Sequence, residues 1–97
     1  MLSTIEPLPL LFSAVETFDA RQCHAALDFC REQLEGHAKK REFYLKMKSR
    51  CKATSDNCWR AWRLCYAALE RLIEQIQHTR RGVVARLQSL PKSEQHR

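Results

Sequence analysis

Glycine and proline are scarce in this chain of 97 residues, and where they lie limits the possible folds. The three prolines, Pro7, Pro9 and Pro91, are near the ends, and there are only two glycines. Proline ends helices and glycine weakens them, so nothing between Phe12 and Leu90 obliges a helix to stop except a polar turn. The composition therefore predicts an all-α chain that forms one domain.

Long apolar runs are also missing. The longest run is Leu8 to Phe12, which Pro9 interrupts, and a membrane span needs roughly 18 apolar residues. The N-terminus has no basic stretch, and Glu6, Pro7 and Pro9 break up what would be the apolar part of a secretion signal. We therefore expect no membrane partner and a cytoplasmic location, where the five cysteines would be reduced thiols.

Motifs of catalytic, metal and cofactor sites are absent as well. The two glycines are isolated, so there is no phosphate-binding loop. The cysteines recur at intervals of seven residues, whereas zinc sites take paired ligands from spacings of about two to four residues. None of the four histidines has a carboxylate or cysteine at a catalytic spacing. We expect no enzyme activity, no metal and no cofactor, and interpret the cysteines as small buried residues.

What the chain does contain is a heptad ladder in its second half. Eight positions recur four and three residues apart: Cys58, Trp62, Cys65, Leu69, Leu72, Ile76, Thr79 and Val83. This spacing predicts a helix with a seam that meets other helices, and apolar or small residues on both flanks widen the seam enough for two neighbours. We expect self-association to use five of these residues: Trp62, Leu69, Leu72, Ile76 and Val83.

A second apolar stripe of helical period lies over residues 19–45. Two capping-box patterns, Ser13 with Glu16 and Asp19 with Gln22, are alternative starts for this helix.

Residues 54–57 are turn and N-cap formers, and no N-cap signal follows Gly36, so the first helix is expected to continue past that glycine. The predicted segments are an extended apolar strap over 1–12, helices over about 14–53 and 57–89 with a turn near 54–56, and a disordered tail over 91–97.

These two helices are expected to form a long antiparallel helical hairpin. A turn near residue 55 pairs positions whose numbers sum to about 110, which brings Lys48 beside Trp62. With a second copy, the wide apolar faces predict a homodimer that is a four-helix bundle. The same pairing sets Cys51 opposite Cys58, where the geometry permits a disulfide that a reducing compartment disfavours.

Positive charge is concentrated at the turn. Residues 37–63 hold nine basic and two acidic side chains, a net +7, whereas residues 1–36 carry −4. Candidate protein-binding residues at this tip are Phe43, Met47, Arg50, Trp59, Arg60 and Arg63. Candidate phosphate contacts are Lys39, Lys46 and Lys52.

Three functions fit this pattern. The favoured hypothesis is a small non-enzymatic adaptor, chaperone or inhibitor that binds another protein through a helical-bundle surface. A regulator that binds nucleic acid through the basic tip is one alternative, because lysine, arginine and aromatic side chains together suit a nucleic acid strand. A subunit of a larger assembly is the other.

Overall fold

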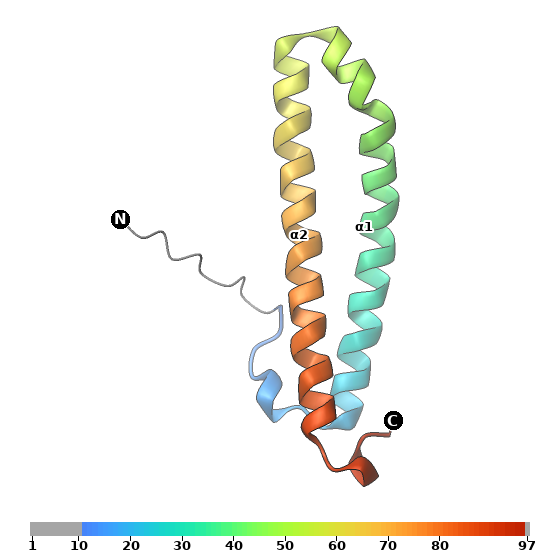
Figure 1. Cartoon of the computed structure of the whole chain (residues 1–97), viewed down its shortest axis with the longest axis vertical. Helices are drawn as coiled ribbons and strands as arrows, with labels where there is room; N and C mark the ends of the chain where they lie inside the picture. The colour runs from blue at the N-terminus through green and yellow to red at the C-terminus, as the bar shows by residue number, and fades with distance from the viewer. Residues whose placement is uncertain (1–10, 97) are drawn as a thin grey trace, which may run out of the picture.

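Two long antiparallel helices make up most of the molecule (Figure 1). The structure is a computed structural model and describes residues 11–96. Helix α1 spans Ala20–Thr54 and helix α2 spans Asp56–Ser89, with short 3-10 helices η1 at Val15–Thr17 and η2 at Lys92–Glu94. The described part of the chain contains no strand, so the predicted all-α helical hairpin is confirmed.

Helix α1 begins at a complete capping box. The Asp19 carboxylate accepts a hydrogen bond from the Gln22 amide at 2.8 Å, and the Gln22 side-chain oxygen accepts one from the Asp19 amide at 2.9 Å. The alternative start at Ser13 is not used, because Ala14 adopts the left-handed conformation with φ 56° and the chain turns there into η1. The helix therefore starts at residue 20 and not at 14.

A single residue, Ser55, makes the turn between the two helices. Its extended backbone, with φ −169° and ψ 162°, ends α1. Its hydroxyl then accepts a hydrogen bond from the Cys58 amide at 3.1 Å, which caps the start of α2. Within α1, the 35 residues run through Gly36 without a break, as predicted.

The core is a narrow seam between the helices. Its buried residues are Val15, Ala20, Cys23, Ala26, Cys30, Trp62, Leu69, Ile76, Thr79 and Val83. Four of the five residues predicted for self-association are thus buried inside one hairpin, while Leu72 remains 46% exposed. These four side chains pack within their own hairpin, so of the five residues only Leu72 remains accessible to a second copy.

Cross-helix contacts show the register. The Lys48 ammonium lies 5.9 Å from the centroid of the Trp62 ring, which confirms the predicted pairing. Further toward the open end, Arg41 lies 3.9 Å from the Glu70 carboxylate.

The chain before α1 packs onto the open end of the hairpin. The Phe12 ring contacts Phe18 and Phe29 at centroid distances of 6.1 and 5.7 Å, and Arg86 Nε donates a hydrogen bond to the Phe18 carbonyl at 2.8 Å. The predicted strap over 1–12 falls mostly outside the described residues, since only Leu11 and Phe12 belong to them.

The tail after α2 is held in place where disorder was expected. Residues Lys92–Glu94 form η2, and the Gln95 side-chain amide donates to the Leu90 carbonyl at 2.8 Å. The His24 ring Nε2 in turn lies 2.8 Å from the Gln95 carbonyl oxygen. These bonds satisfy carbonyl groups at the end of α2 and tie the tail to α1.

Thr79 provides a test of how the N-terminal segment is anchored. Its fully buried side-chain oxygen accepts a hydrogen bond from the Leu11 amide at 2.9 Å. We expect Thr79→Val to leave that amide without an acceptor, at a cost of about 1 kcal/mol in unfolding free energy. Hydrogen exchange followed by NMR should show protection of the Leu11 amide in the wild type and its loss in Thr79→Val. Thr79→Ser keeps the oxygen and is the control, so equal loss of protection in both variants would contradict the role of the hydrogen bond.

Candidate protein-binding site

An apolar groove runs along one side of the contact between α1 and α2. It consists of two connected hollows of about 490 and 460 Å³ that share Leu34 and Ala38. Toward the open end the first hollow is lined by Leu27, Asp28, Arg31, Leu34, Glu35, Ala38, Arg80 and Val84. Toward the tip the second is lined by Leu34, Ala38, Arg41, Glu42, Leu45, Ile73 and Gln77. We call this surface the open groove.

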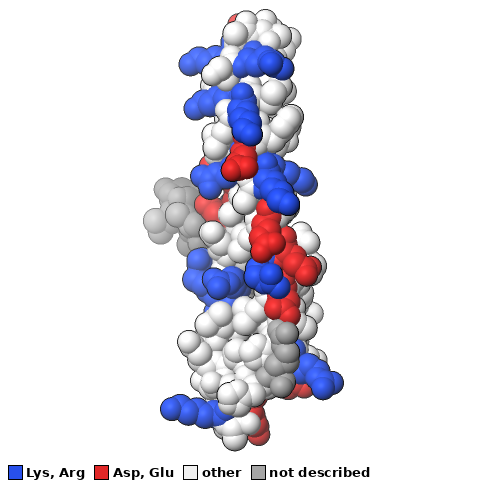
Figure 2. All heavy atoms as spheres, turned by 90° about the vertical axis from the view of Figure 1, so that its right-hand side faces the viewer, with Lys and Arg blue, Asp and Glu red and all other residues white. Residues whose placement is uncertain are grey.

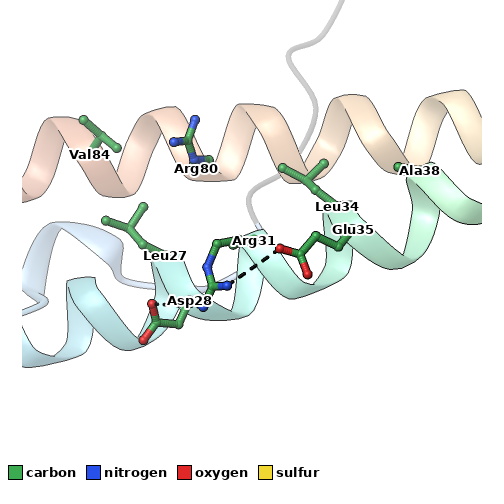
Figure 3. A pocket seen from close by; sticks show the side chains of 8 residues that line it. All are labelled: Leu27, Asp28, Arg31, Leu34, Glu35, Ala38, Arg80 and Val84. Atoms are coloured by element: carbon green, nitrogen blue, oxygen red, sulfur yellow. Dashed lines mark ion pairs between the residues drawn. The ribbon is translucent and has the colours of Figure 1, made fainter.

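The spacing of the apolar residues explains the floor of the open groove. Leu27, Leu34, Ala38 and Leu45 follow one another at seven, four and seven residues, so they form one line along α1. Figure 3 shows Leu27 and Leu34 pointing from α1 toward α2, which supplies Val84 to the same hollow. The described part of the chain places no other element over this line, and Leu45 remains 48% exposed.

The other side of the same helix contact is partly filled. Phe12 and Phe18 pack against the buried cluster of Val15, Cys23, Ala26 and Val83. A smaller hollow of about 240 Å³ remains there between Phe12 and Leu72. The two sides of the hairpin thus differ, because the described N-terminal segment covers only one of them.

Charged side chains form the rim of the open groove. Arg31 lies along α1 with its guanidinium 3.8 Å from Asp28 and 3.7 Å from Glu35 (Figure 3). These pairs are exposed, so they orient side chains more than they stabilise the fold. An apolar floor between charged rims is typical of a surface that binds a helix.

Arg41 has a particular position within the groove. Its Nε donates a hydrogen bond to the Tyr66 hydroxyl at 3.2 Å, and its guanidinium faces the Glu70 carboxylate. The hydrogen bond to Tyr66, together with the nearby Glu70 carboxylate, raises the pKa of Arg41. Arg41 therefore stays charged, and its head is held toward α2 and not out over the apolar floor.

At the tip, three aromatic rings of α2 form a stack. Trp59, Trp62 and Tyr66 are spaced three and four residues apart, which puts them on one face of the helix. Their centroids are 5.2 and 4.9 Å apart, and their planes differ by 9° and 8°. The Trp62 indole N–H donates to the Tyr44 carbonyl of α1 at 2.8 Å, and Lys52 lies over Trp59 at 5.5 Å. The stack therefore joins the helices near the turn.

The residues predicted for the tip are spread over both helices. Arg50, Arg60 and Arg63 are exposed, Phe43 is 60% exposed, and Met47 and Trp59 are half-buried. Phe43, Met47 and Arg50 share one face of α1 by their spacing, whereas Trp59 belongs to the stack on α2. The three predicted phosphate contacts, Lys39, Lys46 and Lys52, are all exposed.

Charge separates along the outer side of α1. Figure 2 views the molecule from that side and shows basic side chains gathered at the tip end and acidic ones in the middle. By sequence these are the positive residues 37–63 and the acidic residues of the preceding segment, including Glu32 and Glu35. Residues 37–63 thus carry a net charge of +7, whereas the other residues of the chain sum to −1.

The five cysteines lie in three environments. Cys23 and Cys30 are fully buried in the core, Cys65 is exposed, and Cys51 and Cys58 are half-buried beside the turn. Burial raises the pKa of Cys23 and of Cys30. Within residues 11–96, no three side chains of histidine, cysteine, aspartate or glutamate are grouped so that they could bind a metal ion. In that same range neither long helix has a stretch apolar enough to cross a membrane.

Comparisons with protein-family models, with curated proteins and with solved structures find no match for this chain. The open groove and the tip are the two surfaces of the described residues that bear on its function.

The sequence predicts the apolar stripe to which the leucines of the groove belong, but it does not predict the groove. Leu27, Leu34 and Leu45 belong to the apolar stripe predicted over residues 19–45, and the pairing rule alone does not show that they lie at its edge. The wide apolar face of α2, which predicts a second neighbouring helix, indicates that these leucines lie at the edge of the contact between α1 and α2. Leu64, which is 68% exposed on α2, gave no signal in the heptad pattern because it lies outside the ladder.

The buried thiols predict a pH dependence of stability. In the unfolded chain the thiols of Cys23 and Cys30 ionise near their ordinary pKa of 9.0, whereas the folded core keeps them protonated to higher pH. The contribution of these protonated thiols to the free energy of unfolding is complete below pH 9.0 and is lost as the pH rises through their pKa in the folded chain. The slope of this loss is at most about 1.4 kcal/mol per pH unit for each thiol. Urea unfolding from pH 7 to 10.5 should show this decline.

The control compares two substitutions at equal pH. Replacing Cys23 and Cys30 together by alanine should flatten the decline, while Cys65→Ala, at an exposed thiol, should leave it unchanged. Identical slopes in all three proteins would show that the buried thiols do not cause it.

Proposed function

We propose that this protein is a non-enzymatic protein-binding module that accepts helices of a partner in the open groove. The observation that carries the proposal is the groove itself, a continuous apolar floor with charged rims and a half-exposed Leu45. While the open groove is exposed to water, the protein lacks about 25 cal/mol of stabilisation for each Å² of apolar surface that remains unburied. Covering the open groove with a helix recovers this stabilisation.

The dimensions of the groove suit a helix. Leu27 and Leu45 are 18 residues apart, which corresponds to about 27 Å along α1, or five helical turns. A partner helix with apolar residues at steps of three and four would place a side chain in each hollow.

The occupant we commit to is a second copy of the chain, with the two hairpins antiparallel. A parallel pair would bring together two tips that each carry +7. An antiparallel pair instead sets each tip beside the open end of the other hairpin, and the residues outside 37–63 carry a net charge of only −1, so the repulsion between tips is avoided. The product is a four-helix bundle, in which the core left open by one hairpin is closed by the other.

This arrangement leaves one face of the tip available for a different protein. Phe43, Met47 and Arg50 lie on the α1 side of the tip, away from Leu34 and Ala38 at the middle of the groove. Exposed aromatic, methionine and arginine side chains are enriched at protein interfaces. An adaptor, chaperone or inhibitor would use this surface once the bundle has formed.

Substitution of Ala38 tests the groove. Ala38 lines both hollows and is exposed, so Ala38→Glu leaves the core of the hairpin intact while placing a carboxylate on the groove floor. Each dimer would bury two such carboxylates, and we expect its dissociation constant to rise by about 100-fold or more. Sedimentation equilibrium of wild type and variant measures this change.

Ala67→Glu is the matched control. Ala67 is also an exposed alanine of a long helix and lines neither hollow of the groove, so the substitution adds the same charge outside the groove. It should leave the dissociation constant within about threefold of the wild type. A wild type that stays monomeric at millimolar concentration would contradict the second copy as occupant, and equal effects of the two substitutions would contradict the groove.

Binding of nucleic acid is the second candidate function, favoured by the exposed basic side chains of the tip. The aromatic rings argue against a stacking platform, because Trp62 lies between Trp59 and Tyr66 and Lys52 covers Trp59. Contacts to phosphates through Lys39, Lys46 and Lys52 remain open to this hypothesis.

Salt dependence separates these functions. Phosphate contacts predict that affinity for a single-stranded oligonucleotide falls by about 0.7 log unit per log unit of salt for each contact. Fluorescence anisotropy between 50 and 300 mM salt measures the slope, and a flat response would exclude the nucleic-acid hypothesis.

The third function, a subunit of a larger assembly, predicts that the chain expressed alone is insoluble or unfolded, which the same preparation reveals.

A further inference from the structure

Two thiols meet across the turn of the hairpin. Cys51 comes four residues before Ser55 and Cys58 three residues after it, so the turn folds one back onto the other. The Cys51 thiol donates a hydrogen bond to the Cys58 sulfur. The next pair of positions shows the same register, because the Lys52 ammonium lies 5.5 Å from the centroid of the Trp59 ring. The turn therefore places residues 51 and 58 beside each other, which a disulfide requires.

This pair differs from the other three cysteines in access. Cys23 and Cys30 are fully buried, which shields them from reagents in solution. Cys51 and Cys58 are both half-buried at the end of the molecule, where a small reagent can reach them. Arg50, in the same strongly basic segment, partly offsets the rise in the pKa of Cys51 that the hydrogen bond to Cys58 and burial cause.

We propose that Cys51 and Cys58 are a redox-responsive dithiol, which a low-molecular-weight disulfide such as oxidised glutathione converts into an intrachain disulfide across the turn. This modification site is independent of what binds in the open groove.

The reaction balances as two thiol–disulfide exchanges. One of the two protein thiolates attacks one sulfur of the external disulfide, which forms a mixed disulfide and releases one small thiolate. The other cysteine then loses its proton, attacks the protein sulfur of the mixed disulfide and displaces the second small thiolate. The protein thiols are oxidised by two electrons, the external disulfide is reduced to two thiols, and the two protein protons end on those thiols.

The hydrogen bond to Cys58, together with burial, raises the pKa of Cys51. Whichever thiol reacts first with the external disulfide, the second step is favoured because its target is already held beside it across the turn.

Oxidation also selects the bent conformation. If α1 and α2 were to join into one straight helix, residues 51 and 58 would be about 10.5 Å apart along its axis. A disulfide needs α-carbons no more than about 7 Å apart, so it cannot form in the straight helix. The oxidised chain is therefore fixed as a hairpin and cannot exchange α2 with a second chain.

The test treats the folded full-length chain with excess oxidised glutathione at pH 8, followed by alkylation and mass spectrometry. Trypsin cleaves after Arg50, Lys52 and Arg60, so Cys51 and Cys58 end on separate peptides that stay joined only through the disulfide. We expect the joined peptides in the wild type and in Cys65→Ser, with a loss of two hydrogen atoms per chain. In Cys58→Ser we expect no joined peptides and a stable glutathione adduct on Cys51.

Thermal unfolding supplies a second readout. The disulfide should raise the melting temperature of the wild type by about 5 °C or more, and reduction should reverse the shift. Cys51→Ser and Cys58→Ser should show no such shift on oxidation.

Three results would each overturn the proposal. They are glutathione adducts on both thiols without ring closure, chains linked through Cys65 as the main product, and five unreacted thiols after treatment. If Cys58→Ser does not fold, Cys51→Ser takes its place in the comparison.

Discussion

The antiparallel contact between α1 and α2 is the constraint on which the other features depend. Each helix carries an apolar stripe wider than one neighbour can cover, and a pair of helices has only one line of contact. The residues on that line, such as Leu69 and Val83, are buried, while those beside it stay at the edge. The open groove is the direct result, because Leu34 and Leu45 belong to the stripe but lie off the line.

The hairpin closes its two ends by different means. At the open end, aromatic side chains and the η1 segment cover the small residues Cys23 and Ala26. At the tip, the hydrogen bond from Trp62 to the Tyr44 carbonyl joins the helices, and lysine side chains cover the rings. Neither device reaches the middle of the molecule. The groove therefore lies in the middle of the hairpin, where α1 and α2 contact only each other. A further helix would bury the most additional apolar surface there.

Sequence reasoning reached the architecture because the signals for it are local. The heptad spacing, the turn formers around Ser55 and the capping box at Asp19 each act within a few residues, and the register follows from the turn. The distribution of burial is not local, since it depends on which side of the helix contact each residue takes. The heptad pattern therefore predicts contacts between copies for Trp62 and Ile76, although one chain buries them. The position of the turn alone predicts that Cys51 lies opposite Cys58, because the pairing of residues across a hairpin is best determined next to its turn.

The one-residue turn at Ser55 also has a consequence for how the chain folds. Contacts next to the turn, such as Lys48 with Trp62, close short loops, whereas Cys23 and Val83 are 60 residues apart. Loop closure is least costly for the shortest loops, so pairing begins at the tip and each layer shortens the loop for the next. We expect the hairpin to zip from Ser55 outward. The most completely buried layer, around Val83, would then be the last to form.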